Sequence, residues 1–162
     1  MKLATFLLDA KTTWGIVTDD GVSDCGAVLR AKYPSLKRLI DANAYAEAAA
    51  ASATAKKYPL SAVEWLPVIP DPAKILCIGL NYEKHRVEAG RAESQHPSVF
   101  TRFADTQLGH AKNLIRPFAS EQLDYEGELA VVIGRHGRHI SRDDAMDYVA
   151  GYSCYNDVSV RD

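Results

Sequence analysis

The strongest β-strand pattern in the sequence lies in residues 124–134, which read Asp124-Tyr125-Glu126-Gly127-Glu128-Leu129-Ala130-Val131-Val132-Ile133-Gly134. Apolar and branched residues predict a strand from Glu126 to Gly134. Side chains two positions apart in a strand share a face, so Glu126 and Glu128 are expected on one side, about 6 to 7 Å apart. Ala130 and Val132 continue that face as apolar, which places the two acids beside a buried surface. The ordinary alternative is an acidic, solvent-facing strand.

Two carboxylates on one face can bind the same cation, and Asp157 can supply a third oxygen ligand. Asp157 follows Asn156 at the end of a second predicted strand; taken alone, it is more typical of a turn. A ligand set without histidine or thiolate favours a hard cation, so Glu126, Glu128 and Asp157 predict Mg²⁺ or Mn²⁺ over Zn²⁺, with Ca²⁺ left open.

His85 and Glu88 are three residues apart in a segment, residues 83–89, that is expected to be helical. They therefore share a helix face, where the carboxylate can orient the imidazole and raise its basicity. This arrangement is typical of a general base with its orienting acid. The ordinary alternative is an exposed ion pair on a surface helix. His136 and His139 have no cysteine or third ligand beside them, and are interpreted as solvated turn residues.

The amino-terminal part predicts a small antiparallel meander followed by helices. Residues 2–9 and 13–18 are rich in strand formers, and the turn at Asp20-Gly21 precedes a third predicted strand over residues 22–29. Ser35 is expected to cap a helix whose apolar residues fall on one face, and residues 44–55 are rich in alanine, a strong helix former.

A cluster of prolines then predicts a domain boundary near Asp71, because proline fixes its own φ and disfavours helix in the residue before it. The expected domains are residues 1–70 and residues 71–162. Within the second, residues 74–80 predict a buried strand and residues 99–103 a short strand; Ser141 is expected to cap a helix and residues 148–155 to form a strand.

Bulk properties exclude several classes of partner. With 19 Lys and Arg against 21 Asp and Glu, the 162-residue chain has a formal charge of -2 and no block of like charge, so neither nucleic acid nor an anionic membrane is expected. A small molecule is the expected partner. Three widely spaced cysteines indicate reduced, buried thiols rather than disulfides. The apolar run over residues 3–8 is too short for a signal-peptide core or a membrane span, which makes the cytoplasm the expected compartment.

Motifs of the common nucleotide-binding and hydrolytic enzymes are absent. The sequence contains no GxGxxG, GxxxxGK[ST], GxSxG or HExxH pattern. Dinucleotide, nucleoside triphosphate, serine-hydrolase and zincin chemistry are therefore not indicated.

Three motifs in a fixed order resemble the fumarylacetoacetate hydrolase family. They are NYxxHxxE over residues 81–88, DYExELAVVIG over residues 124–134, and NDVSxRD over residues 156–162. The strand at residues 74–80 and Gly151-Tyr152 also fit, so the resemblance runs from Lys74 to Asp162. Any one motif is weak evidence, whereas the three together are specific.

The resemblance implies an α+β protein, with a small amino-terminal α/β domain and the first part of the mixed β-roll of the fumarylacetoacetase-like catalytic domain. It implies that Glu126, Glu128 and Asp157 hold the metal, and that His85 and Glu88 form the catalytic pair on a mobile lid helix. Homodimers are typical of the family. The rest of the roll and a further active-site lysine are expected beyond Asp162, so a truncated chain is expected.

Tyr82 and Arg102 are the expected substrate contacts. Some family members carry lysine where Arg102 stands. The lysine ammonium is a point charge, whereas the arginine guanidinium is a planar fork, so the two side chains hold a substrate carboxylate differently.

The expected activity is that of a magnesium-dependent hydrolase that cleaves carbon–carbon bonds of 2-oxo or β-diketo acids of the acylpyruvate or fumarylacetoacetate type. The cation would act as a Lewis acid, and His85 would take a proton from the attacking water. One alternative is a decarboxylase or isomerase of 2-oxo diacids, of the 2-hydroxyhepta-2,4-diene-1,7-dioate type, in aromatic compound catabolism. A non-catalytic metal-binding fragment is a second, and a carbohydrate- or ion-binding module a third.

Overall fold

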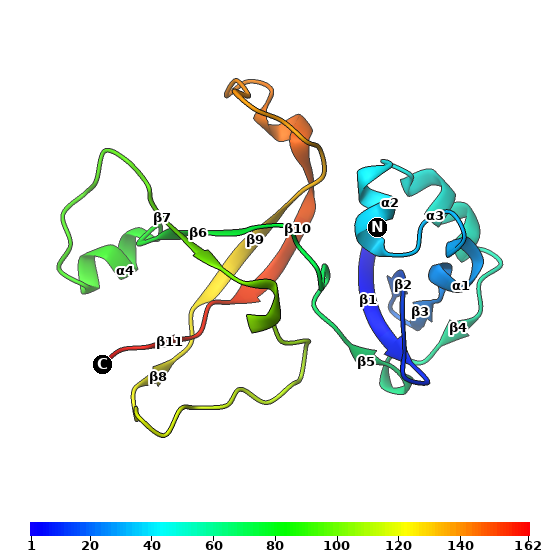
Figure 1. The fold of residues 1–162 in the computed structure, drawn as a ribbon, viewed down its shortest axis with the longest axis horizontal. Coiled ribbons are helices and arrows are strands. Elements are labelled where there is room, and N and C mark those ends of the chain that lie inside the picture. The colour runs from blue at the N-terminus through cyan, green and yellow to red at the C-terminus, as the bar shows by residue number, and fades with distance from the viewer. The chain divides into compact units, whose positions relative to one another are not determined.

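The computed structural model describes residues 1–162 and contains both helices and strands (Figure 1). The strands are β1 (Lys2–Leu8), β2 (Lys11–Thr18), β3 (Gly21–Ser23), β4 (Lys57–Tyr58), β5 (Glu64–Trp65), β6 (Ile75–Gly79), β7 (Ser98–Arg102), β8 (Leu123–Asp124), β9 (Gly127–Ile133), β10 (Val149–Asn156) and β11 (Ser159–Val160). The α-helices are α1 (Cys25–Leu29), α2 (Leu36–Asp41), α3 (Tyr45–Ser52) and α4 (Glu83–Glu88). None of these helices has both the length and the apolar character needed to cross a membrane.

The amino-terminal residues form a five-stranded sheet in the order β4-β3-β2-β1-β5. The pairs β1–β2 and β2–β3 are antiparallel, which confirms the predicted meander. The third strand was predicted too long, because β3 ends at Ser23 and α1 begins at Cys25. Asp24 is the cause: its side chain accepts a hydrogen bond from the backbone N–H of Ala27 at 3.0 Å and so caps the helix.

Helices α2 and α3 agree with the predicted helices. The Ser35 hydroxyl accepts a hydrogen bond from the backbone N–H of Arg38 at 3.3 Å, and the apolar face of α2 is buried. The core that these helices close contains Trp14, Ile16, Cys25, Tyr33, Leu36, Leu39, Ile40, Ala44, Ala48 and Ala51. Val132 of β9 and Ala150 of β10 also pack against this core.

Leu39 is fully buried in this core, so its truncation tests the packing directly. We expect Leu39→Ala to lower the free energy of unfolding by about 2 to 5 kcal/mol, because it removes apolar contacts and leaves a cavity. Urea denaturation followed by circular dichroism measures the change. Val28→Ala is the control, because Val28 is 51% exposed and its truncation should change stability by about 0.5 kcal/mol or less. Equal unfolding midpoints for the two variants would contradict the assigned core.

The chain divides into two compact units, which are Met1–Ile69 with Leu108–Asp162, and Pro70–Gln107. The first break falls beside the predicted boundary near Asp71. Leu108–Asp162 is grouped here with the amino-terminal residues, whereas the prediction placed all of 71–162 in one domain.

The unit Pro70–Gln107 contains the antiparallel pair β6–β7 and the helix α4. The predicted strands and helix are present, but the strand over residues 74–80 is not buried as expected. Cys77 is buried, whereas Leu76 is 60% exposed. Side chains alternate between the two faces of a strand, and here one face of this strand is solvent-exposed.

Two further predictions from the sequence need correction. Ser141 caps only a turn: its hydroxyl accepts a hydrogen bond from Asp144 N at 3.2 Å, and a 3₁₀ helix follows over Ala145–Tyr148 instead of an α-helix. All three cysteines are free, and Cys25 and Cys77 are buried, but Cys154 is exposed.

Candidate metal centre

The predicted metal acids lie at one end of the antiparallel pair β9–β10. In this pair Glu128 is opposite Tyr155 and Gly127 is opposite Asn156. The backbone N–H of Asp157 donates to the carbonyl oxygen of Glu126 at 2.9 Å, which extends the same register by one residue. Directly opposite residues, and residues two apart on a strand, share a face of the pair. The register therefore brings the backbone positions of Glu126, Glu128 and Asp157 together.

These three acids differ in their exposure to solvent. The side chain of Glu126 is 19% exposed, Glu128 is half-buried, and Asp157 is only 3% exposed. Ala130 and Val132, on the same face of β9 as Glu128, are also half-buried. A buried aspartate at the end of a strand is not the solvated turn residue that Asp157 alone would suggest, because burying a carboxylate without compensating contacts is costly.

Glu126 is held by contacts from residues far along the chain. Its backbone N–H donates to Asn156 Oδ1 at 2.9 Å. Its carboxylate oxygen Oε1 accepts a hydrogen bond from Ser159 Oγ at 2.8 Å and lies 2.9 Å from Arg161 Nη2. These contacts fix both the backbone and the side chain of the first predicted ligand.

A second short ladder supports this junction. Strands β8 and β11 pair antiparallel, with Ser159 opposite Asp124 and Val160 opposite Leu123. Arg161 donates from Nε at 3.0 Å and from Nη2 at 2.8 Å to Asp124 Oδ2. Hydrogen bonding to Asp124 is the main reason that the pKa of Arg161 is raised.

Sequence reasoning did not single out Arg161 or Asp124, although both lie inside the quoted motifs. Their partnership depends on β8 pairing with β11, and strands of two residues carry almost no periodic signal.

The donor chemistry of the three acids fits a hard divalent cation, since carboxylate oxygens are the ligands that Mg²⁺ and Mn²⁺ prefer. The structure contains no group of three or more His, Cys, Asp or Glu side chains already arranged to hold a metal ion. It therefore defines the backbone positions of the three acids, and their joint role as ligands stays a prediction.

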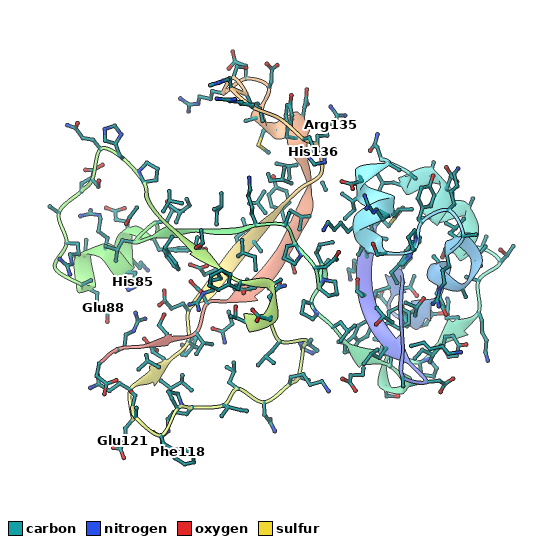
Figure 2. All side chains as sticks on the ribbon, viewed as in Figure 1. His85, Glu88, Phe118, Glu121, Arg135 and His136 are labelled. Carbon is teal, nitrogen blue, oxygen red and sulfur yellow. The ribbon has the colours of Figure 1, made fainter.

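The predicted catalytic pair lies on α4, within the unit Pro70–Gln107, where Figure 2 labels both residues. His85 is half-buried and Glu88 is exposed. Tyr82 is the residue immediately before this helix, and Arg102 is the last residue of β7 and half-buried. The four residues therefore belong to one unit and the three acids to the other.

The histidines after β9 are exposed, in agreement with their interpretation as turn residues. Figure 2 shows Arg135 and His136 in the turn that follows β9.

Comparison with known proteins defines the class. Residues 74–162 match the family described as "Fumarylacetoacetate (FAA) hydrolase C-terminal". The chain belongs to this family, which confirms the family assignment. The match begins one residue before β6 and includes every predicted site residue.

Two curated relatives and one solved structure illustrate the similarity. The chain is 48% identical over 92 residues to the fumarylacetoacetate hydrolase domain-containing protein 2 homolog of Dictyostelium discoideum, covering 57% of this chain and 30% of that protein. It is 46% identical over 110 residues to the oxaloacetate tautomerase YisK of Bacillus subtilis, covering 65% of this chain and 36% of that protein. The matched stretches are thus about a third of the length of these relatives.

The solved structure is maleylpyruvate hydrolase from Sphingobium sp. SYK-6 in complex with manganese(II) ion and pyruvate. Its TM-score is 0.80 at 27% identity, covering 99% of this chain and 60% of that one. This likeness confirms the predicted fold class. The named relatives are a hydrolase and a tautomerase, so the chain belongs to a family of enzymes that includes both activities.

Proposed function

We propose that this chain carries a divalent-cation site, formed by Glu126, Glu128 and Asp157, for keto–enol tautomerisation of a 2-oxo dicarboxylic acid such as oxaloacetate. The choice of reaction depends on the 46% identity to a tautomerase that is named for oxaloacetate. The site itself is supported by the register of β9 and β10, which brings the three acid positions together. Mg²⁺ and Mn²⁺ both suit this ligand set, and Ca²⁺ stays open.

Each residue has a distinct role in this proposal. A bound divalent cation supplies Lewis-acid stabilisation of negative charge on the oxygens of the 2-oxo acid. His85 removes a proton from the carbon beside the keto group, and the imidazolium formed returns a proton, directly or through water, to the keto oxygen to give the enol. Glu88 orients the imidazole of His85. Tyr82 and Arg102 contact the substrate, the guanidinium of Arg102 binding a carboxylate through its planar fork.

Hydrolytic carbon–carbon cleavage of acylpyruvate-type substrates is the second candidate. It is favoured by the likeness to maleylpyruvate hydrolase, which was solved with manganese and pyruvate. In this case His85 takes a proton from water, which attacks the second carbonyl. The carbon–carbon bond beside that carbonyl then breaks, the departing enolate carbon takes up a proton, and the products are a 2-oxo acid and a carboxylate. Decarboxylation or isomerisation of 2-oxo diacids in aromatic compound catabolism is a further alternative, and like tautomerisation it needs no hydrolytic water.

Product analysis by ¹H NMR separates these reactions. The chain is incubated with oxaloacetate and with an acylpyruvate in Mg²⁺ or Mn²⁺, beside a blank that contains the metal alone. We expect keto–enol exchange of oxaloacetate to be faster than in the blank, and this acceleration to be lost after treatment with a chelator. Two new carboxylic products from the acylpyruvate would support the hydrolase instead. Metal binding without turnover of either substrate would contradict both and favour a non-catalytic metal-binding fragment.

Homodimer formation and a cytoplasmic location stay predictions from the sequence. Analytical ultracentrifugation tests the first: we expect a sedimenting species of about twice the 17.8 kDa chain mass.

A further inference from the structure

A single guanidinium joins two carboxylates where the two ladders meet. Arg161 Nη2 lies 2.8 Å from Asp124 Oδ2 and 2.9 Å from Glu126 Oε1, while Nε holds the same Asp124 oxygen at 3.0 Å. The side chain of Arg161 is 36% exposed and that of Glu126 is 19% exposed, and the guanidinium contacts two carboxylates, so this is a network and not an isolated surface pair. Arg161 N also donates to Gln122 O at 3.1 Å, which fixes the backbone from which the side chain extends.

Ser159 provides a second donor to the same oxygen of Glu126. Its hydroxyl donates to Oε1 at 2.8 Å, and its backbone pairs with Asp124 in the β8–β11 ladder. Glu126 Oε1 is therefore held from two directions by residues of one short segment, Ser159 and Arg161. A carboxylate held in this way has less rotamer freedom to lose when it binds a ligand.

The charges of the network also matter. Arg161 alone would weaken binding of a cation at Glu126, because like charges repel. Asp124 accepts two hydrogen bonds from Arg161 and balances its charge, so the Asp124–Arg161 pair can hold Glu126 without adding net positive charge beside the acids.

We propose that Arg161, anchored on Asp124, is a positioning residue that orders the carboxylate of Glu126 for a divalent cation. This inference rests on the metal centre proposed above, and deepens it by assigning the groups that prepare one ligand. Positioning and charge predict opposite effects on cation affinity when Arg161 is removed. Charge alone predicts stronger cation binding, because Asp124 is left as an extra negative charge. Loss of the positioning of Glu126 predicts weaker binding.

Mn²⁺ binding to the whole chain, followed by the electron paramagnetic resonance signal of free Mn²⁺, tests the inference. We expect Arg161→Gln to weaken Mn²⁺ binding about 10- to 100-fold, the range typical of residues that orient a metal ligand. Arg161→Lys should recover part of this loss, since it keeps the charge but not the planar fork. Arg135→Gln is the charge-matched control, because Arg135 lies in the exposed turn after β9. The Mn²⁺ affinity of this variant should equal that of the unmodified chain.

Ser159→Ala provides an independent variant should Arg161→Gln fail to fold, as judged by circular dichroism. It removes one hydrogen bond from an uncharged donor to the Glu126 carboxylate, and we expect about 2- to 10-fold weaker binding. If Ser159 only stabilises the β8–β11 pair, Ser159→Ala should lower the thermal midpoint of unfolding and leave the Mn²⁺ affinity of the folded chain unchanged.

The outcomes separate the two proposals. No Mn²⁺ binding by the unmodified chain would overturn the metal centre itself. Binding by the unmodified chain with equal or tighter binding by a folded Arg161→Gln variant would overturn only the positioning role. If Arg161→Gln does not fold, unchanged affinity in both Arg161→Lys and Ser159→Ala would overturn it.

Discussion

Glu126→Gln is expected to weaken Mn²⁺ binding by more than about 100-fold, beyond the loss typical of residues that only orient a ligand. Glutamine keeps the size of the side chain and can still accept a hydrogen bond from Ser159 Oγ, but it carries no charge for the cation. Turnover of oxaloacetate or of an acylpyruvate should be lost together with the metal. Isothermal titration calorimetry at constant pH measures the affinity, and NMR measures turnover.

Glu121→Gln is the matched control for this substitution. Glu121 is an exposed acid five residues before Glu126, and Figure 2 labels it in the loop that precedes β8. It carries the same charge but lies outside the predicted ligand set, so its loss should leave metal affinity and turnover unchanged. Undiminished affinity in Glu126→Gln would refute the assignment of Glu126 as a ligand.

His85→Asn is expected to reduce kcat about 10²- to 10⁴-fold, the usual contribution of a positioned general acid or base. Mn²⁺ affinity should not change, because His85 is not one of the predicted ligands. Asparagine retains the polarity and approximate size of histidine. Steady-state kinetics at saturating metal, with whichever of oxaloacetate and the acylpyruvate the unmodified chain turns over, compares kcat of the variant with that of the unmodified chain.

His96→Asn is the control here, since His96 is exposed and outside the three family motifs. Full turnover in His85→Asn would show that another group transfers the proton. A joint loss of turnover and Mn²⁺ affinity would instead place His85 among the groups that hold the metal.

Local patterns in the sequence predicted most of the secondary structure. Ser35 and the apolar residues Leu36, Leu39 and Ile40 specify α2 by capping and periodicity, and both features are present. The errors arise where a short polar contact outweighs strand propensity. Asp24 ends the third strand by capping α1, although Val22 and Val28 had favoured a continuous strand.

Burial was harder to predict than element type. The residues of β6 form an apolar run, which predicts burial on both faces, yet Leu76 is exposed. Cys154 was expected to be a buried thiol, like the other two cysteines, but its side chain lies on the exposed face of β10. Which face of a strand is covered depends on tertiary contacts that the chain order alone does not give.

The candidate site was predicted to the extent that its residues lie close in sequence. Glu126 and Glu128 follow from the two-residue alternation of a strand. Asp157 was predicted as a third oxygen ligand at the end of a strand, and the resemblance to a family implied the same role. The register of β9 and β10, continued by the hydrogen bond from Asp157 N to Glu126 O, brings its backbone position close to Glu126, and its role as a ligand stays a prediction. Arg161 was not predicted, because its contact with Glu126 depends on the β8–β11 ladder.

Crystals of the chain grown with Mn²⁺ offer the most direct test of the metal centre, by anomalous scattering at the manganese absorption edge. We expect one strong anomalous peak within about 2.0 to 2.6 Å of carboxylate oxygens from Glu126, Glu128 and Asp157 together. An anomalous peak elsewhere, or none at saturating Mn²⁺ with Asp157 directed away from the two glutamates, would contradict it.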